Sequence, residues 1–448
     1  MGPRLPHAPR APRRRRAVVA APAAWVNWAG EQRCAPALLD APADEAGVVA
    51  AVQRAAGDGA VLRVAGSGHS FTDIVCTDGH LLSLRRLHRV LDADPDSGLV
   101  RVQAGITLHA LGEQLALRGL ALENQGDIDA QSLAGALATA THGTGTAFGN
   151  LSSRVAGMRL ISASGEAVEL TGGDELRAAR VGLGALGVVT EVMLRCVPAF
   201  TLERIDEPRS LRAVLDGLDG LVDGHDHFEF WAFPYADRVM ARRCTRSQRE
   251  PRPRGGAGER VKERLENEGM TAAGRLAGRV PRAVPRLNRA LMRLVSRDVV
   301  VDRSHRVYAS RRDVRFTEME YAVPRERARE AVAGVLELVA RRRLPIAFPI
   351  EVRFVAADDA LLSPAHGRDT CYVAVHQHAG QPFEAYFDAV EELMDGLDGR
   401  PHWGKRHGQG AATLSGRYPG WDAFAEVRDR LDPQRRFANA YVQRVLGA

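Results

Sequence analysis

Apolar residues in the first part of the chain recur in short runs that alternate between strand-like and helix-like spacing. Ala60–Ala65 and Leu99–Ala104 are rich in strand-forming residues, and each run ends next to a glycine. Leu108–Leu117 instead spaces its leucines three or four residues apart, which predicts a helix with one apolar face. Val155–Ser162 and Ala167–Leu170 flank a Ser-Gly-Glu turn and predict a β-hairpin. This mixture predicts an α+β or α/β unit.

The pattern of apolar and aromatic residues changes after Pro198, where the strand-like run Val188–Val197 ends. Beyond it lies a predicted helix, Arg325–Arg341, which follows a proline. Three aromatic or apolar strand-like runs accompany it: Phe228–Phe233, Arg315–Val323 and Ile346–Val355. We therefore expect a second unit, built on an antiparallel sheet with covering helices.

An arginine-rich insertion at residues 245–300 interrupts the second unit. Ser247–Gly258 has the Pro, Gly and Arg composition of a disordered loop. Farther on, Leu287, Leu291 and Leu294 follow helical spacing with arginines between them, which predicts a basic amphipathic helix. Such a helix can contact an anionic membrane surface, although an ordinary surface helix has the same pattern.

Composition narrows the classes of function. The chain is 45% hydrophobic and 26% charged, as in globular proteins, and no apolar run is long enough for a membrane-spanning helix. A net charge of +6 is small for 448 residues and argues against a nucleic-acid partner. The five cysteines are far apart and show no metal-ligand spacing, so we predict free thiols in a reducing compartment and no metal site.

The N-terminus imitates a secretory signal only superficially. Arg13–Arg16 precede an apolar run, but this run is short and is broken by Pro22. We therefore expect a disordered basic tail over residues 1–24 and a cytoplasmic protein.

Three glycine-rich loops beside predicted strands carry the candidate chemistry. They are GSGHSFTD at residues 66–73, ATATHGTGTAFG at 138–149 and GLGALGVVTEV at 182–192. Glycine lets backbone N–H groups approach a phosphate closely, so three such loops suggest an extended dinucleotide. The Rossmann spacing GxGxxG between a strand and a helix is absent. On this pattern alone, His69 in the first loop could equally be a surface or capping histidine.

Longer segments make a family resemblance definite. GSGHSFTD, RVQAGITLHALGEQL, ENQGDIDAQSLAGALATATHGTG and ARVGLGALGVVTEVMLRCVP resemble the FAD-binding domain of the vanillyl-alcohol-oxidase superfamily. FPIEVRF, RPHWGK and LDPQRRFANAYVQRVL are similar to the C-terminal half of its aldonolactone oxidases. The resemblance runs collinearly from about Trp25 to Leu446 and weakens mainly in the insertion. It implies an α+β fold with a PCMH-type FAD-binding domain at 25–198, a substrate-binding cap domain at 199–430, and a segment at 431–448 that returns to the first domain.

The resemblance also implies the cofactor and its attachment. In that family the histidine of the GSGHS loop is bonded to the 8α-methyl carbon of the flavin, so His69 is expected to carry 8α-histidyl-FAD. The implied cofactor-binding positions are Gly66, Ser67, Gly68, His69, Ser70, Gly126, Asp127, Thr141, His142, Gly143, Thr144, Gly145, Gly187 and Val188.

Gly126 bears on the electron acceptor. In similar enzymes the residue at this position stands beside the reactive edge of the flavin, where glycine leaves space for dioxygen and alanine tends to block it. The resemblance therefore favours an oxidase that releases hydrogen peroxide over a dehydrogenase. A simple turn glycine between Asn124 and Asp127 would give the same sequence.

Glu351 and Arg353 are the first candidate substrate residues. Strand alternation in FPIEVRF places them on one face, opposite the apolar Ile350, Val352 and Phe354. Such a pair is commonly a solvated ion pair. In the resembled family the matching residues contact substrate hydroxyls beneath the flavin, so the resemblance implies a pocket.

Lys405 is the third candidate. Of the 61 basic residues only Lys262 and Lys405 are lysine, and an ammonium group offers a compact charge that a guanidinium does not imitate. Lys405 also lies in the family-like segment RPHWGK.

These residues predict FAD-dependent oxidation of a sugar 1,4-lactone (gulono-, galactono- or arabinonolactone) at its C2 hydroxyl, by hydride transfer to flavin N5. Arg353 and Lys405 would polarise the reacting hydroxyl while Glu351 anchors its neighbours. The proton acceptor stays open, since His376 and His378 on a predicted strand fit that role and a structural role equally well.

Three alternatives remain. An alditol oxidase would use the same flavin on an open-chain polyol, and a lactone dehydrogenase would use an acceptor other than oxygen. A non-catalytic basic protein that binds membranes or nucleic acid would purify without colour.

Overall fold

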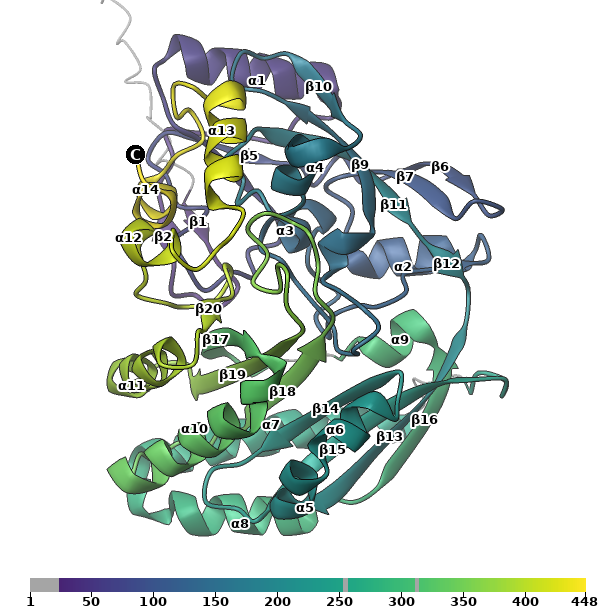
Figure 1. The fold of residues 1–448 in the computed structure, drawn as a ribbon, viewed down its shortest axis with the longest axis vertical. Helices are drawn as coiled ribbons and strands as arrows, with labels where there is room; N and C mark the ends of the chain where they lie inside the picture. The colour runs from purple at the N-terminus through teal and green to yellow at the C-terminus, as the bar shows by residue number, and fades with distance from the viewer. Residues whose placement is uncertain (1–23, 253–256, 311–313) are drawn as a thin grey trace, which may run out of the picture.

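The computed structural model describes residues 24–252, 257–310 and 314–448, which form two stacked units (Figure 1). The first unit begins with a parallel sheet in the order β3 (Leu38–Asp40), β5 (His80–Ser83) and β4 (Leu62–Ala65). Helix α1 (Glu45–Gly57) connects β3 to β4 and buries one apolar face in the core. The side chain of Asp44 accepts a hydrogen bond from Gly47 N and caps this helix.

An antiparallel sheet completes the first unit, in the order β10-β9-β11-β7-β6. Its strands are β6 (Val90–Asp94), β7 (Leu99–Gln103), β9 (Val155–Ile161), β10 (Ala167–Leu170) and β11 (Val188–Arg195). Helices α2 (Leu108–Ala116), α3 (Leu133–Ala138) and α4 (Gly173–Arg180) accompany the two sheets. The predicted β9–β10 hairpin and the predicted helix at α2 are confirmed.

The second unit contains one eight-stranded antiparallel sheet, in the order β16-β13-β15-β14-β18-β19-β17-β20 (Figure 1). Its strands are β13 (Thr201–Ser210), β14 (His227–Ala232), β15 (Arg238–Ser247), β16 (Asp298–Arg303), β17 (Phe316–Pro324), β18 (Ile350–Val355), β19 (Thr370–His378) and β20 (Arg400–Pro401). The antiparallel sheet predicted beyond Pro198 is therefore confirmed.

The two faces of this sheet differ in polarity because its strands alternate. Ile350, Val352 and Phe354 point into an apolar core that is shared with four covering helices. These helices are α5 (Leu211–Asp216), α6 (Leu218–Asp223), α10 (Ala328–Arg342) and α11 (Glu384–Asp395). The opposite face carries Glu351 and Arg353 and is buried nonetheless, at 9% and 8% exposure. The charged face therefore lines an interior rather than open solvent.

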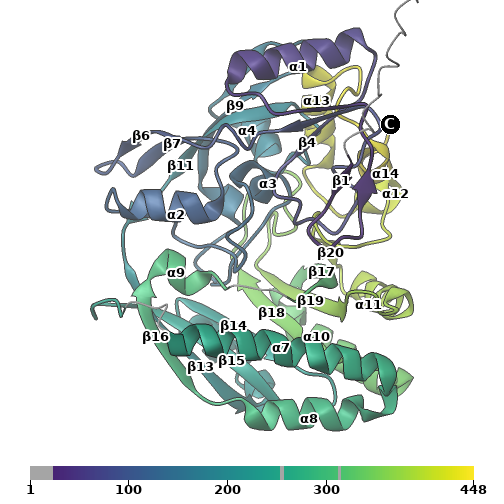
Figure 2. The same ribbon diagram turned by 180° about the vertical axis from the view of Figure 1, so that it is seen from behind.

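The insertion is more regular than the sequence predicts. Helix α7 (Ala257–Arg279) includes the end of the predicted loop, whose residues 253–256 lie outside the described part of the chain. It crosses the sheet on the side away from α10 (Figure 2), and Gly274 lies against the ring of His378. The predicted basic helix is present as α8 (Val284–Leu294). Its Leu294 is 81% exposed, so part of the apolar stripe faces outward. No described helix is long and apolar enough to cross a membrane.

The C-terminal helices pack on the first unit, as Figure 1 shows for α13 (Trp421–Leu431) and α14 (Ala440–Leu446). Arg63 of β4 donates to Phe437 O at 2.5 Å. Asn439 Nδ2 donates to the carbonyls of Asp73, Ile74 and Cys76, which follow the first glycine loop. The last residues of the chain thus hold the loop that carries His69.

Asn439 offers a test of this contact. Its Oδ1 also accepts from Val442 N and caps α14, so Asn439→Ala removes both the cap and the three donations. We expect the free energy of unfolding, measured by urea denaturation, to fall by about 1–3 kcal/mol. Asn439→Asp keeps the capping oxygen but turns a carboxylate oxygen toward the three carbonyls, so its loss should be at least as large. Equal stability of all three proteins would contradict this account.

Candidate functional site

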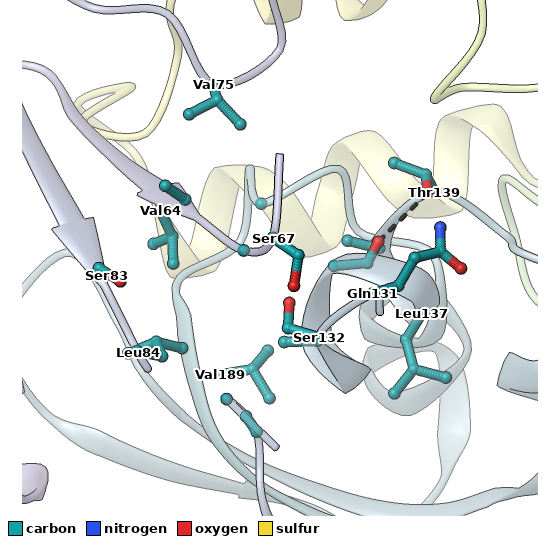
Figure 3. Close-up of a pocket in the computed structure, with 18 of the residues that line it drawn as sticks. Val64, Ser67, Val75, Ser83, Leu84, Gln131, Ser132, Leu137, Thr139 and Val189 are labelled. Atoms are coloured by element: carbon teal, nitrogen blue, oxygen red, sulfur yellow. Dashed lines mark hydrogen bonds between the residues drawn. The ribbon is translucent and has the colours of Figure 1, made fainter. Parts of the chain in front are cut away.

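A cavity of about 680 Å³ opens where the two parallel strands β4 and β5 end. Ala65 and Ser83 pair at the ends of these strands, so the loops that follow both strands emerge at the same edge of the sheet. Figure 3 shows Ser67 and Ser83 on one side of the cavity, with Gln131 and Ser132 near the start of α3.

Of the predicted cofactor-binding residues, Gly66–Ser70 and Gly187 line this cavity. Sequence reasoning missed the loop that begins at Ser83 and the segment Gln131–Ser132. The former could have been found by recognising HLLS as a strand parallel to β4, because neighbouring parallel strands deliver their loops to the same edge. The segment Gln131–Ser132 has no sequence pattern that would have indicated its place in the cavity.

The first glycine loop presents its backbone to the cavity. In the described part of the chain, the N–H groups of Ser67–Ser70 donate no hydrogen bond to a protein atom. Gly68 has a φ of +73°, which favours glycine, and a Cβ at Gly66 would stand 2.3 Å from Ser132 Oγ, so a side chain there would displace Ser132. Consecutive N–H groups that have no acceptor in the described protein can bind an oxyanion such as a pyrophosphate.

His69 lies within this row of N–H groups and is held as a neutral imidazole. Its ring stacks on Trp28, with 5.6 Å between ring centroids. Burial lowers the pKa of His69 to about 4, and the charges of Lys405 and Arg315 act in the same direction. A neutral ring keeps a nitrogen lone pair available for bond formation.

The rest of the lining is largely apolar and suits the flat rings of a flavin dinucleotide. It includes Val64, Ile74, Leu84, Leu137, Met158, Leu160, Leu186 and Val189. The chemistry of the cavity, with unclaimed N–H groups beside apolar walls and a neutral histidine, therefore fits FAD.

The second glycine loop forms hydrogen bonds to the second unit. Thr144 Oγ1 donates to Phe228 O at 2.5 Å, and Gly145 N donates to Phe354 O at 2.6 Å. His227 Nδ1 meets Thr144 O at 2.6 Å. These bonds attach the loop to strands β14 and β18 of the second unit. Thr141–Gly145 do not line the cavity, and neither does Val188, the first residue of β11. Their roles in cofactor binding stay predictions.

Gly126 packs against this same loop. A Cβ at Gly126 would stand 2.9 Å from His142 O, a backbone atom. Alanine at this position would require the backbone at His142 to shift, so packing favours glycine whatever the electron acceptor is. Beside it, the side-chain nitrogens Asn124 Nδ2 and Gln125 Nε2 are buried and form no hydrogen bond in the described chain. Such groups are costly unless a ligand or water satisfies them.

Arg353 is the centre of the charged face. Its Nε donates to Glu229 Oε2 at 2.7 Å, and one Nη pairs with Glu351 and lies 3.5 Å from Asp127 Oδ1. Burial opposes the charge of Arg353, but the carboxylates of Glu351, Glu229 and Asp127 raise its pKa well above the usual value. Asp127 thus joins the two units through Arg353, and its predicted role in cofactor binding stays a prediction.

Glu229 extends this network across the sheet. Arg242 on β15 donates to Glu229 at 3.2 Å and to Asp206 on β13 at 2.7 Å. The register explains the contacts, because Glu229 pairs directly with Arg353 on one side and Arg242 on the other. Sequence reasoning missed Glu229, although HFEFWA shows the same apolar–charged alternation as FPIEVRF.

Lys405 forms a second charged group on the same face. Its Nζ pairs with Glu318 of β17, and it lies over the ring of Phe71 at 5.2 Å. Burial lowers the pKa of Lys405, but Glu318 and Glu320 outweigh burial and raise it. Phe71 N donates to Gly404 O at 2.7 Å, which fixes this segment beside the His69 loop. The structure thus brings the half-buried Lys405 near Glu351 on the buried charged face and near His69 in the cavity.

Glu320, two residues beyond Glu318, has its own partner. His142 Nε2 lies 3.1 Å from Glu320 Oε1, and His142 Nδ1 lies 2.9 Å from Gly143 O. His402 stands close to both and accepts a hydrogen bond from Gly404 N at its Nδ1. Burial lowers the pKa of His402 to about 3 despite the nearby Glu320.

Comparison with known proteins agrees with this architecture. A model of the D-arabinono-1,4-lactone oxidase family matches residues 192–445, and a model of an FAD binding domain matches residues 36–171. An L-gulono-1,4-lactone dehydrogenase of Mycobacterium tuberculosis is 56% identical over 94% of this chain and 99% of its own length. An L-gulonolactone oxidase of Mus musculus is 32% identical over 94% of this chain and 97% of its own. The crystal structure of a cholesterol oxidase from B. sterolicum aligns over 94% of this chain and 96% of its own, with a TM-score of 0.80 and 17% identity.

Fold and cavity together define a flavoprotein oxidoreductase with a PCMH-type FAD-binding domain. The charged cap sheet and the family match narrow this class further. The chain belongs to the D-arabinono-1,4-lactone oxidase family. The predicted family and fold class are confirmed.

The buried histidines predict how stability depends on pH. Burial lowers the pKa of His69 and His378 to about 4 and that of His402 and His407 to about 3. The unfolded chain binds these protons near pH 6.5, so stability is complete above pH 6.5 and is lost as pH falls toward 4. Each histidine contributes up to about 1.4 kcal/mol per pH unit in that window. Asp358, whose pKa burial raises to about 6, acts in the opposite direction.

We therefore expect a lower urea midpoint at pH 5.5 than at pH 7.5. His378→Gln should reduce the difference between the two midpoints, whereas His88→Gln, at an exposed position, should leave it unchanged. A midpoint that does not change with pH would contradict the burial of neutral histidines.

Proposed function

We propose that the protein oxidises a sugar 1,4-lactone at its C2 hydroxyl with FAD as the hydride acceptor. One observation carries this proposal: Glu351 and Arg353 lie on a buried charged face, and the half-buried Lys405 is close enough to both Glu351 and His69 of the cavity to influence their charges. A small polyhydroxylated substrate suits such a face, because its hydroxyl groups replace the hydrogen bonds that buried charges require. The names of the two relatives support a lactone substrate.

The chain's own residues bind and orient this substrate. Arg353 is fixed by three carboxylates and cannot swing away, so it presents a stationary positive charge to the reacting oxygen. Lys405 presents a second positive charge, held by Glu318. Glu351 accepts hydrogen bonds from neighbouring hydroxyls. When bound, FAD supplies N5 as the hydride acceptor and passes the two electrons on.

His69 is proposed to carry the flavin through an 8α-histidyl bond. Its place in the cavity and its neutral ring support the bond, since the imidazole nitrogen must act as a nucleophile.

The electron acceptor has two candidates. Dioxygen, giving hydrogen peroxide, is favoured by the resemblance at Gly126 and by the name of the Mus musculus relative. A different acceptor is favoured by the Mycobacterium tuberculosis relative, which is named a dehydrogenase and is the more similar of the two. Because the close approach of His142 O already favours glycine at position 126, that residue does not decide between them. An open-chain polyol remains the alternative substrate.

Anaerobic mixing with an aldonolactone tests the proposal. Substrate should bleach the flavin absorbance near 450 nm, and Arg353→Ala should slow bleaching by about 100-fold or more because a fixed charge at the reacting oxygen is lost. The variant must first show normal flavin content. Bleaching by alditols but not by lactones would select the polyol alternative, and no bleaching by either would refute the proposed reaction.

Reoxidation of the bleached protein then separates the two acceptors. An oxidase recovers its colour on admission of air within its turnover time and releases peroxide. A dehydrogenase recovers rapidly only with an added acceptor such as cytochrome c or a dye.

A further inference from the structure

Oxidation of an alcohol to a ketone releases a proton as well as a hydride. The C2–H bond breaks with its electron pair going to the flavin, and the O–H bond breaks with its electrons staying on oxygen to form C=O. We propose that Glu318 accepts this proton and passes it to Nε2 of His376. The inference rests on the proposed function, since it concerns the hydroxyl that the reaction consumes.

Glu318 and His376 are paired in the sheet and in contact. They stand opposite each other on β17 and β19. One carboxylate oxygen of Glu318 pairs with Lys405, and the other lies 3.5 Å from His376 Nε2. Glu318 therefore joins the substrate-side charge of Lys405 to a histidine that lies deeper in the cap.

The backbone determines which nitrogen of His376 can receive the proton. His376 Nδ1 lies 3.2 Å from Pro349 O, and a carbonyl can only accept, so Nδ1 carries the hydrogen. Nε2 of the neutral ring then has its lone pair directed at Glu318. After transfer, the imidazolium donates to Pro349 O on one side and to the Glu318 carboxylate on the other. Both nitrogens are satisfied, which stabilises the charged ring.

The neighbouring basic groups do not fit this role. Lys405 and Arg353 are paired with carboxylates that raise their pKa values despite burial, so neither has a lone pair to offer. His378 lies on the same face of β19, but its ring abuts Gly274 of α7, and its Nε2 has no partner in the described chain. The structure thus separates the two histidines that the sequence leaves equivalent.

The pair is shielded from water. His376 and Glu318 are each 5% exposed, and the ring of His376 stacks on Phe348 at 4.9 Å and meets Phe316 at 5.3 Å. The titratable or charged groups that surround the pair are Lys405, Glu320, Glu351, His378 and His402. Of these, Lys405, Glu320 and Glu351 carry charge in both states of the relay. The transfer itself changes the charge of Glu318 only transiently, because the proton moves on, and leaves the added charge on His376.

The test is the pH dependence of anaerobic flavin bleaching by an aldonolactone. In the unmodified protein, acid should slow bleaching, because a high proton concentration opposes loss of the hydroxyl proton through the relay. His376→Gln should slow bleaching by about 100-fold at neutral pH, remove this acid dependence, and recover partly as hydroxide becomes available. Glu318→Gln should also lower the rate and, because Glu318 holds Lys405, it should weaken substrate binding as well.

His378→Gln is the matched control, since it makes the same chemical change two residues away on the same strand. Its rate should stay within twofold of the unmodified protein, with the acid dependence intact. Flavin content and melting temperature identify any variant that fails to fold, and Glu318→Gln then serves in place of His376→Gln. A normal rate and normal acid dependence in correctly folded His376→Gln and Glu318→Gln would overturn the relay alone. An unmodified protein that no lactone or alditol bleaches would overturn the proposed function as well.

Discussion

A buried arginine needs carboxylates around it, and Arg353 has three: Glu229, Glu351 and Asp127. Desolvation of a guanidinium costs several kcal/mol, so its position is stable only where opposite charges surround it. Two of these carboxylates come from the cap sheet and the third comes from the FAD-binding unit. The ion pair between Arg353 of the cap sheet and Asp127 of the FAD-binding unit therefore holds the two units together. Removing Arg353 would deprive these buried carboxylates of the counter-charge that they share.

The same charges act differently on the two sides of the interface. On the cap side, Glu318 and Glu320 outweigh burial and keep Lys405 protonated. On the cofactor side, Lys405 reinforces the effect of burial on His69, which stays neutral. Lys405 therefore acts on both sides of the interface. It supplies a positive charge at the cap face, and it adds to the burial that keeps His69 neutral and nucleophilic. This division suits a reaction in which negative charge develops on the substrate oxygen.

Sequence alone predicted much of this arrangement because alternation is visible in a single strand. FPIEVRF placed Glu351 and Arg353 opposite Ile350, Val352 and Phe354, and the sheet has that alternation. The same signal was present for Glu229 and Glu318, yet their importance depends on which strands are neighbours. Cross-strand register is a long-range property that no local pattern contains. Helix α7 was missed for a different reason, since its glycines and arginines give a weak apolar stripe.

The glycine loops show the limit of reasoning from residue type. Small residues at 66–70 line the cavity, whereas equally small residues at 141–145 attach the first unit to the cap through backbone hydrogen bonds. Both loops need close approach of the backbone, one to a ligand and the other to strands. Glycine marks close approach without saying what is approached.

The central claim is that His69 holds FAD covalently in the cavity beside the charged cap face, and acid precipitation tests it most directly. Protein purified from flavin-replete cells is denatured in acid, and absorbance spectra are taken of the pellet and the supernatant. The account predicts a yellow pellet whose flavin is recovered on the peptide that contains His69. Flavin released entirely into the supernatant would contradict the covalent bond, and colourless protein would contradict the assignment of the cavity to FAD.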